Sequence, residues 1–251
     1  MDDAGVAGPE TLITADAPNL TIVVPAYNEG PNIRPVVSEI VETIAANPWV
    51  GAYEIVLVDD GSRDGTATEM DQLATELPQV RVFHHSINRG FGAALKTGFA
   101  NSRGRAVGFI SGDGEIGVDQ PLRLFKEMGD HDLMLSGRAR TVGAARSFLT
   151  WGVNWTSRLL LGFWPDNSVG IWVARGDLLR SMPLHSDTGL VNLEVILHCQ
   201  AQKRSILLSG VTQGRPRLSG ESKVTNVRTI ARIFWEMWKL RWRIRRQNGQ
   251  P

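Results

Sequence analysis

Three short acidic segments carry the side chains of this 251-residue sequence that are best suited to chemistry. They are Asn28-Glu29, Asp59-Asp60 and Asp113-Gly114-Glu115, and each follows an apolar run typical of a β-strand. In a sheet built from βαβ units, such segments meet at one edge, where ligands bind. Carboxylate oxygens suit Mg²⁺ or Mn²⁺, which bridge phosphates. The sequence therefore predicts one site for a nucleotide and a divalent metal ion.

Asp113 and Glu115 are the best candidates for metal ligands, because paired carboxylates supply the oxygen atoms that a hard cation prefers. An isolated Asp-x-Glu sequence is more often a solvated turn, but this one follows the fourth predicted strand, in line with the other two segments. Asp60 is suited to accept a hydrogen bond from a nucleobase N–H group. Taken by itself, the stretch 59–62 is more readily explained as a capped turn before a helix.

Alternating strand and helix patterns place these acidic segments. The predicted strands are 20–26, 53–58, 80–84, 106–111, 169–174 and 205–209, and the predicted helices are 32–44, 64–77, 91–101, 146–162, 190–202 and 225–246. Residues 210–222 are predicted to be a loop. This pattern predicts an α/β fold with a mostly parallel central sheet and flanking helices. We expect a flexible leader at 1–18, a catalytic domain at 19–222 and a C-terminal helix within 223–251.

The composition is that of a globular protein, with 42% hydrophobic and 21% charged residues, and it excludes a disordered chain. One cysteine, Cys199, excludes an internal disulfide framework and a zinc cluster and fits a reducing compartment. No uncharged apolar run is long enough to cross a bilayer, and the start of the chain does not read as a signal peptide. These features predict a cytoplasmic location.

The C-terminal segment has the opposite charge to the rest of the chain. From Lys223 to the end there are eight basic residues and one acid, Glu236, a net charge of +7, so the other residues sum to −6 in a chain of net charge +1. A basic, tryptophan-bearing amphipathic helix suits the headgroup layer of an anionic membrane. The alternative is a helix whose apolar side packs on the domain. The acidic remainder of the chain argues against a nucleic-acid partner.

Six motifs occur in a specific order between residues 20 and about 225, although each motif by itself is weak evidence for a family. They are Val24-Pro25-Ala26-Tyr27-Asn28-Glu29; Val58-Asp59-Asp60-Gly61-Ser62 with Asp64-Gly65-Thr66; Asn88-Arg89-Gly90-Phe91-Gly92-Ala93-Ala94; Ser136-Gly137-Arg138; Gly189-Leu190-Val191-Asn192-Leu193-Glu194; and Arg217 followed by Gly220-Glu221-Ser222-Lys223. The set resembles a family-2 glycosyltransferase, and its spacing is similar to that of the dolichol-phosphate mannose synthase branch.

The resemblance implies a nucleotide-diphospho-sugar transferase fold of the GT-A type and transfer of a hexose from a GDP- or UDP-sugar to a polyprenyl phosphate on the cytoplasmic face of a membrane. The residues that match the nucleoside-binding positions are Pro25, Tyr27, Glu29, Val58 and Asp60. Those that match the metal and diphosphate motif are Gly112, Asp113 and Glu115. Those that match basic residues near the donor and acceptor phosphates are Arg138, Arg217 and Lys223. Asp113 and Arg138 are accordingly the predicted catalytic residues.

Two positions depart from the family pattern. The family usually has Asp-x-Asp-x-Gln where this chain has Ser111-Gly112-Asp113-Gly114-Glu115, so the first carboxylate is a serine and the glutamine is a glutamate. Asp113 and Glu115 still offer two carboxylate groups to a metal ion. Weaker metal binding or a different sugar donor is also compatible with this departure from the family pattern. The family arginine of a later segment is Trp172 here. Recognition of the acceptor phosphate or of the sugar is therefore expected to differ.

The acceptor decides whether a general base is needed. A lipid phosphate is largely ionised at neutral pH and needs no strong base, whereas a hydroxyl acceptor needs one. In that second case Asp187 and Glu194 are the candidates, although Glu194 is also explained as a helix residue paired to a nearby base. A protein that binds the nucleotide sugar without turnover is the third possibility.

Overall fold

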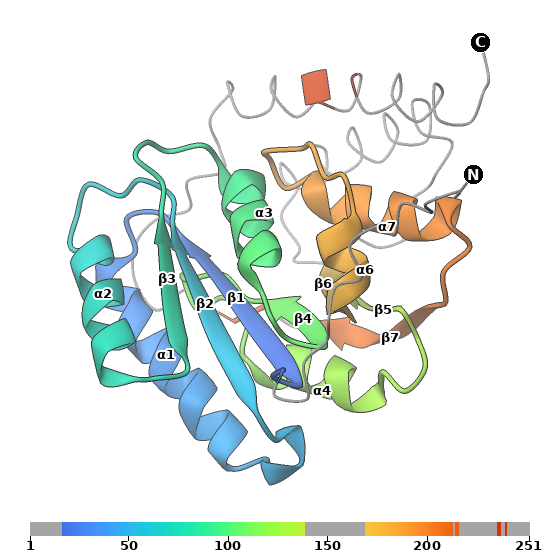
Figure 1. The fold of residues 1–251 in the computed structure, drawn as a ribbon, viewed down its shortest axis with the longest axis horizontal. Coiled ribbons are helices and arrows are strands. Elements are labelled where there is room, and N and C mark those ends of the chain that lie inside the picture. Colours follow the sequence, from blue (N-terminus) through green and yellow to red (C-terminus); the bar gives the residue numbers. More distant parts are fainter. Residues whose placement is uncertain (1–16, 139–168, 213, 216–234, 237–238, 240–251) are drawn as a thin grey trace, which may run out of the picture.

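The computed structural model describes residues 17–138, 169–212, 214–215, 235–236 and 239 (Figure 1). The strands are β1 (Leu20–Ala26), β2 (Tyr53–Asp59), β3 (Val80–His84), β4 (Ala106–Phe109), β5 (Leu133–Arg138), β6 (Val169–Arg175) and β7 (Ile206–Thr212). The helices are α1 (Gly30–Ala45), α2 (Thr66–Glu76), α3 (Phe91–Asn101), α4 (Asp119–Glu127), α6 (Gly176–Ser181) and α7 (Val191–Ala201), with a short 3-10 helix at Pro48–Val50. The strands form a seven-stranded sheet in the order β3-β2-β1-β4-β6-β5-β7.

Strand β1 lies inside the sheet, and all seven of its residues are buried. It pairs in parallel with β2 on one side and with β4 on the other. A strand that is covered on both faces reads as a continuous apolar run, which is why Leu20–Ala26 was predictable from sequence. Because β3 also pairs in parallel with β2, the carboxyl ends of these four strands lie at one edge.

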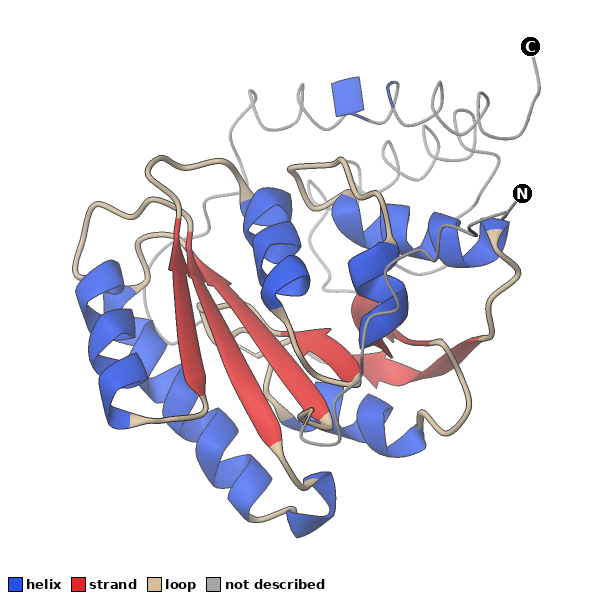
Figure 2. Cartoon of the chain, viewed as in Figure 1, coloured by secondary structure: helices blue, strands red, loops and turns tan. Residues whose placement is uncertain are grey.

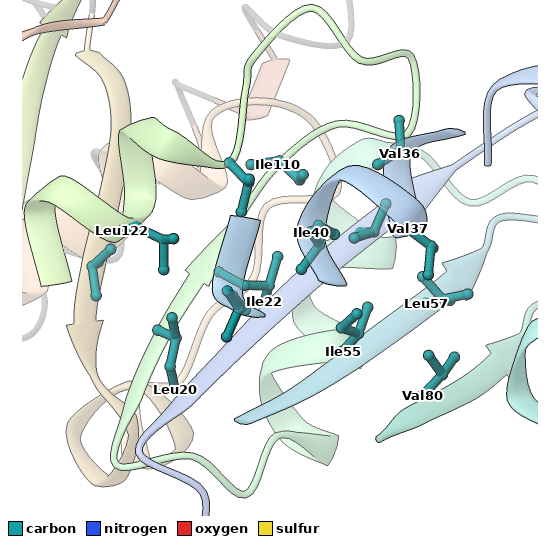
Figure 3. Packing of buried hydrophobic residues seen from close by; sticks show 14 of the residues in the cluster. Leu20, Ile22, Val36, Val37, Ile40, Ile55, Leu57, Val80, Ile110 and Leu122 are labelled. Atoms are coloured by element: carbon teal, nitrogen blue, oxygen red, sulfur yellow. The ribbon is translucent and has the colours of Figure 1, made fainter. Parts of the chain in front are cut away.

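Helices cover both faces of the sheet (Figure 2). Alternate residues of β1 point to opposite faces, so Ile22 packs on one core cluster and Val23 on the other. The first cluster is formed with α1, α2 and α4, and Figure 3 shows its packing around Ile22, Ile40 and Ile55. The second cluster is formed with α3, α6 and α7 and contains Cys199, whose burial raises the thiol pKa to about 11. The expected core position of Cys199 is therefore confirmed.

Strand β6 runs antiparallel to both of its neighbours, β4 and β5, whereas β5 and β7 are parallel to each other. Since β6 reverses direction between β4 and β5, the carboxyl ends of β5 and β7 lie at the same edge as those of β1, β2 and β4. The predicted mostly parallel sheet is confirmed, with β6 as the reversed strand. The edge that collects the predicted acidic segments therefore also receives the ends of β5 and β7.

The predicted elements of the first half of the chain are confirmed within a few residues. Four elements were not predicted: the 3-10 helix at Pro48–Val50, α4, β5 and α6. The loop predicted at 210–222 is wrong at its start, because β7 continues to Thr212 through its pairing with β5.

Some predictions fall outside the described residues. The helix predicted at 146–162 and nearly all of the leader at 1–18 lie there. The C-terminal helix is described at residues 235, 236 and 239, which are helical. In the described part of the chain, no helix has both the length and the apolar character required to cross a membrane.

Candidate active site

Two consecutive carbonyl groups at the end of β1 hold the acidic segments together. The Pro25 carbonyl accepts the N–H of Gly112 at 3.1 Å, and the Ala26 carbonyl accepts the N–H of Asp60 at 2.9 Å. A side chain at position 112 would not fit, since a Cβ there would lie 2.8 Å from the Cβ of Ala26. The loops that follow β2 and β4 are thus fixed on either side of β1, as the strand-end argument predicted.

The loop after β1 is bonded to the loop after β2. Asn28 adopts a left-handed backbone conformation, with φ of +53°, which asparagine tolerates better than most residues. Its N–H donates to Ser62 Oγ at 2.9 Å, and its Oδ1 accepts the N–H of Arg63 at 2.8 Å. The next residue, Glu29, is buried and accepts a hydrogen bond from Asn32 Nδ2 at 2.7 Å. The two loops therefore form one bonded frame at the site edge.

Of the other predicted nucleoside contacts, Tyr27 is half-buried in the same loop, and Pro25 and Val58 are buried. The side chain of Val58 belongs to the second core cluster. Contact between Val58 and a nucleoside would accordingly come from its backbone.

Asp60 is buried at the end of β2, with 3% of its surface exposed. Its Oδ1 accepts the N–H of Arg89 at 2.9 Å and its Oδ2 accepts the N–H of Gly90 at 2.8 Å. His85 Nδ1 lies 2.7 Å from Asp60 Oδ1, which assigns the ring proton to that nitrogen. A carboxylate can accept about four hydrogen bonds. Among the described residues three are made, so Asp60 retains capacity for about one more, such as a nucleobase N–H.

His85 is a residue that sequence analysis did not assign to the site. Its side chain is 5% exposed and lies between Asp60 and Thr97 Oγ1, which is 2.8 Å from Nε2. Its neighbour His84 is partly exposed and lies between Asp71, 3.0 Å from Nε2, and Asp59, 3.3 Å from Nδ1. Because His85 is buried and contacts the Asp60 carboxylate, it restricts the orientation of that carboxylate.

The predicted metal ligands lie in a tight turn after β4. Asp113 is 5% exposed and its Oδ1 accepts the N–H of Glu115 at 3.0 Å, while Gly114 has φ of +70°. Glu115 is half-buried. This pair of hard oxygen donors fits Mg²⁺ or Mn²⁺. No group of three or more His, Cys, Asp or Glu residues that could hold a metal gathers within the described ranges.

The predicted basic residues are placed only in part. Arg138 is the last residue of β5, so its backbone lies at the same sheet edge as Asp60 and Asp113. Arg217 and Lys223 lie outside the described residues. Arg215, which sequence analysis did not single out, contacts the turn at residues 112–115 that holds the predicted metal ligands, called the metal turn below. Its Nε donates to the Gly114 carbonyl at 2.6 Å.

Trp172, at the position of the family arginine, is fully buried in β6. Its ring centroid lies 5.3 Å from that of Phe99 and 5.2 Å from that of Phe109. The indole N–H donates to Asn192 Oδ1 at 3.1 Å. This position therefore serves packing in this chain, and the departure noted in the sequence has a structural reason.

The two candidate bases for a hydroxyl acceptor are both engaged. Glu194 is 1% exposed and accepts the N–H groups of His185, at 3.0 Å, and Ser186, at 2.9 Å. Asp187 Oδ1 pairs with Lys96 Nζ at 2.8 Å. Glu194 Oε1 also lies 3.1 Å from His185 Nδ1. Glu194 thus holds the loop before α7, and the expected pairing with a nearby base is present together with the backbone hydrogen bonds.

A mixed sheet of this strand order, with carboxylates at the ends of β1, β2 and β4, defines a nucleotide-diphospho-sugar transferase fold of the GT-A type. Residues 21–175 match the family model described as Glycosyl transferase family 2, and the chain belongs to that family. Both the predicted fold and the predicted family are confirmed.

Two curated relatives are similar in sequence. The chain is 33% identical over 137 residues to a dolichyl-phosphate beta-glucosyltransferase of Trichomonas vaginalis, a match that covers 51% of this chain and 40% of the relative. It is 26% identical over 172 residues to an undecaprenyl-phosphate mannosyltransferase of Micrococcus luteus, covering 64% of this chain and 68% of the relative. The chain thus spans less than half of the length of the first of these proteins.

A solved structure shares the fold. It is glucosyl-3-phosphoglycerate synthase from Mycobacterium tuberculosis in complex with Mn²⁺, uridine diphosphate and glucosyl-3-phosphoglycerate. The TM-score is 0.61 at 19% sequence identity, and the match covers 95% of this chain and 82% of that chain.

Proposed function

We propose that this protein transfers a hexose, with inversion, from a GDP- or UDP-sugar to a polyprenyl phosphate. The observation that carries the proposal is the joining of Asp60 and Asp113 to one edge through neighbouring carbonyls of β1. The carboxylate proposed to accept a nucleobase N–H and the turn proposed to bind the diphosphate therefore lie on the two sides of one strand. The names of the two curated relatives, both polyprenyl-phosphate glycosyltransferases, support the acceptor class.

In this proposal Asp113 and Glu115 hold Mg²⁺ or Mn²⁺, and the Mn²⁺ and uridine diphosphate in the related structure support a divalent ion. A bound ion offsets the negative charge that develops on the leaving diphosphate. Pro25, Tyr27, Glu29, Val58, Asp60 and Gly112 form the donor side. Arg138, Arg217 and Lys223 bind the donor and acceptor phosphates through charge-assisted hydrogen bonds.

The reaction on the acceptor side needs no strong base. An oxygen of the lipid phosphate forms a bond to the anomeric carbon, while the bond from that carbon to the diphosphate breaks and the nucleoside diphosphate leaves with the electron pair. A phosphate monoester with a second pKa of about 6 is already largely ionised at neutral pH. The engagement of Glu194 with backbone N–H groups and of Asp187 with Lys96 supports this acceptor over a hydroxyl.

We further propose that the C-terminal segment binds the cytoplasmic face of an anionic membrane. Glu236 Oε2 accepts the Thr188 hydroxyl at 2.6 Å, so this residue faces the domain. Trp235 is 55% exposed, and Lys239 Nζ lies 5.0 Å from the centroid of its ring. An exposed tryptophan beside a lysine suits the interfacial layer of such a membrane.

A transfer assay tests the proposed activity. Purified protein with Mn²⁺ is given labelled GDP-mannose, UDP-glucose or UDP-N-acetylglucosamine, with and without a short-chain polyprenyl phosphate. We expect label to enter the organic phase with one donor, and to do so only when the lipid is present. Label that moves instead to a hydroxyl acceptor, or donor binding without any transfer, would overturn the proposed acceptor or the enzymatic activity.

Replacing His85 by phenylalanine is expected to weaken nucleotide binding by about ten-fold, because a hydrogen bond to a charged group contributes about 1.5–3 kcal/mol. Isothermal titration with GDP and UDP measures the change. The control is His131→Phe, since the His131 side chain contacts Ser205 at the amino end of β5, away from the site edge. Equal affinities for both variants and the wild type would show that His85 does not orient Asp60.

A further inference from the structure

Arg215 connects three separate parts of the chain at the predicted metal turn. Its N–H donates to the Glu115 carbonyl at 2.8 Å, and its Nε donates to the Gly114 carbonyl at 2.6 Å. Its Nη1 donates to Glu39 Oε1 at 3.1 Å, and its Nη2 is hydrogen-bonded to Glu39 Oε2. The planar guanidinium is suited to such a fixed fork of donors. One residue of the segment after β7 thus ties the metal turn to α1.

Glu39 gives this connection a rigid base. It lies on α1, which is anchored in the core by fully buried residues such as Val37 and Ile40. Glu39 Oε1 also accepts the N–H of Val118, at 3.4 Å, on the far side of the metal turn. The hydrogen bonds from Arg215 to Glu39 raise the pKa of the guanidinium, so Arg215 stays charged.

The turn itself has little intrinsic rigidity. Gly112 and Gly114 flank Asp113, and glycine loses more conformational freedom on ordering than other residues. Arg215 binds the carbonyls of Gly114 and Glu115. The N–H of the peptide unit between Gly114 and Glu115 donates to Asp113 Oδ1, and the Glu115 side chain follows directly on the same unit. Holding the carbonyls therefore orients both carboxylates before a ligand arrives, which raises affinity.

We propose that Arg215 is a positioning residue that preorders the metal turn for a divalent ion. This proposal rests on the proposed function. The hydrogen bonds from Arg215 to the carbonyls of Gly114 and Glu115 and to Glu39 hold the turn against α1, so less conformational freedom is lost when an ion binds.

The test measures Mn²⁺ binding to the full chain in the presence of UDP or GDP. The electron paramagnetic resonance signal of free Mn²⁺ reports how much of the ion is unbound. Arg215→Gln is expected to weaken Mn²⁺ binding by about 10- to 100-fold, the usual effect of losing a group that orients a metal ligand. The matched control is Arg34→Gln, which removes a similarly exposed ion pair between α1 and Glu76 of α2, at 2.7 Å, away from the metal turn. It is expected to leave Mn²⁺ affinity unchanged.

A charge exchange separates positioning from stability. The double variant Glu39→Arg/Arg215→Glu restores an ion pair, but glutamate cannot donate to the Gly114 carbonyl. We expect its melting temperature to recover relative to Arg215→Gln, while its Mn²⁺ affinity stays low. Recovery of Mn²⁺ affinity in the double variant, or wild-type affinity in Arg215→Gln, would overturn the positioning role.

The outcomes separate the positioning role from the proposed function. If the wild type binds no Mn²⁺ with either nucleotide, the proposed function itself fails. This outcome is distinct from a wild type that binds Mn²⁺ and a variant that is unaffected, which would overturn the positioning role alone.

Discussion

Asp113→Ala is expected to reduce turnover by at least about 10³-fold, because the charge stabilisation that a bound metal supplies amounts to several kcal/mol. The side chain lies in the turn after β4, where its Oδ1 also accepts the N–H of Glu115. The transfer assay with labelled donor measures the loss. The surface variant Asp130→Ala serves as the control for a general effect of removing an acidic residue.

Asp113→Asn separates two roles of this side chain. The amide keeps an oxygen that can accept the Glu115 N–H, so the turn is preserved, but the negative charge is gone. We expect this variant to lose most of the activity while its melting temperature stays at the wild-type value. Full activity in either Asp113 variant would refute the assignment of Asp113 to the metal.

Trp172→Ala is expected to reduce the free energy of unfolding by about 3–5 kcal/mol, the range for removing a large aromatic ring from a core. The ring is fully buried and packs on Phe99 and Phe109. Removing it also removes the indole N–H that donates to Asn192 Oδ1. Urea unfolding followed by circular dichroism measures the change. A loss below about 1 kcal/mol would show that the core collapses around the site, contrary to the close packing seen here.

The same buried environment determines the effect of restoring the family arginine at position 172. In Trp172→Arg the guanidinium would be enclosed by Phe99 and Phe109, and an unpaired charge buried in this way is strongly destabilising. We therefore expect Trp172→Arg to be less stable than Trp172→Phe, with no gain in acceptor affinity. A folded Trp172→Arg variant that binds the lipid phosphate more tightly would contradict this assignment.

The first half of the fold was predictable because its signals are local. Strand β1 is a run of buried apolar residues, and α1 carries a regular apolar stripe at 33, 36, 37, 40 and 44. Helix α4 was missed because Pro121 and charged residues interrupt its short pattern. Strand β5 was missed because its six residues end in the polar sequence Ser136-Gly137-Arg138, which drew attention as a motif rather than as a strand.

The candidate site was predictable to the extent that strand ends define it. Asp60 and Asp113 were placed at one edge by the rule for parallel strands, and the structure brings their loops together. His85 and Arg215 were missed because their partners are distant in sequence, 25 residues for His85 and Asp60 and 101 residues for Arg215 and Gly114. Such contacts depend on how loops from different strands fold against each other, which periodicity does not report.

The use of neighbouring carbonyls at the end of β1 also sets the spacing of the two loops of the proposed donor site. Pro25 and Ala26 hold the metal turn and the Asp60 loop, respectively, so the separation of the two anchors along the strand is one residue, about 3.3 Å. An insertion in β1 would change that separation and shift one loop against the other. Under the proposed function, adaptation to a new sugar is therefore expected to leave the length of β1 unchanged.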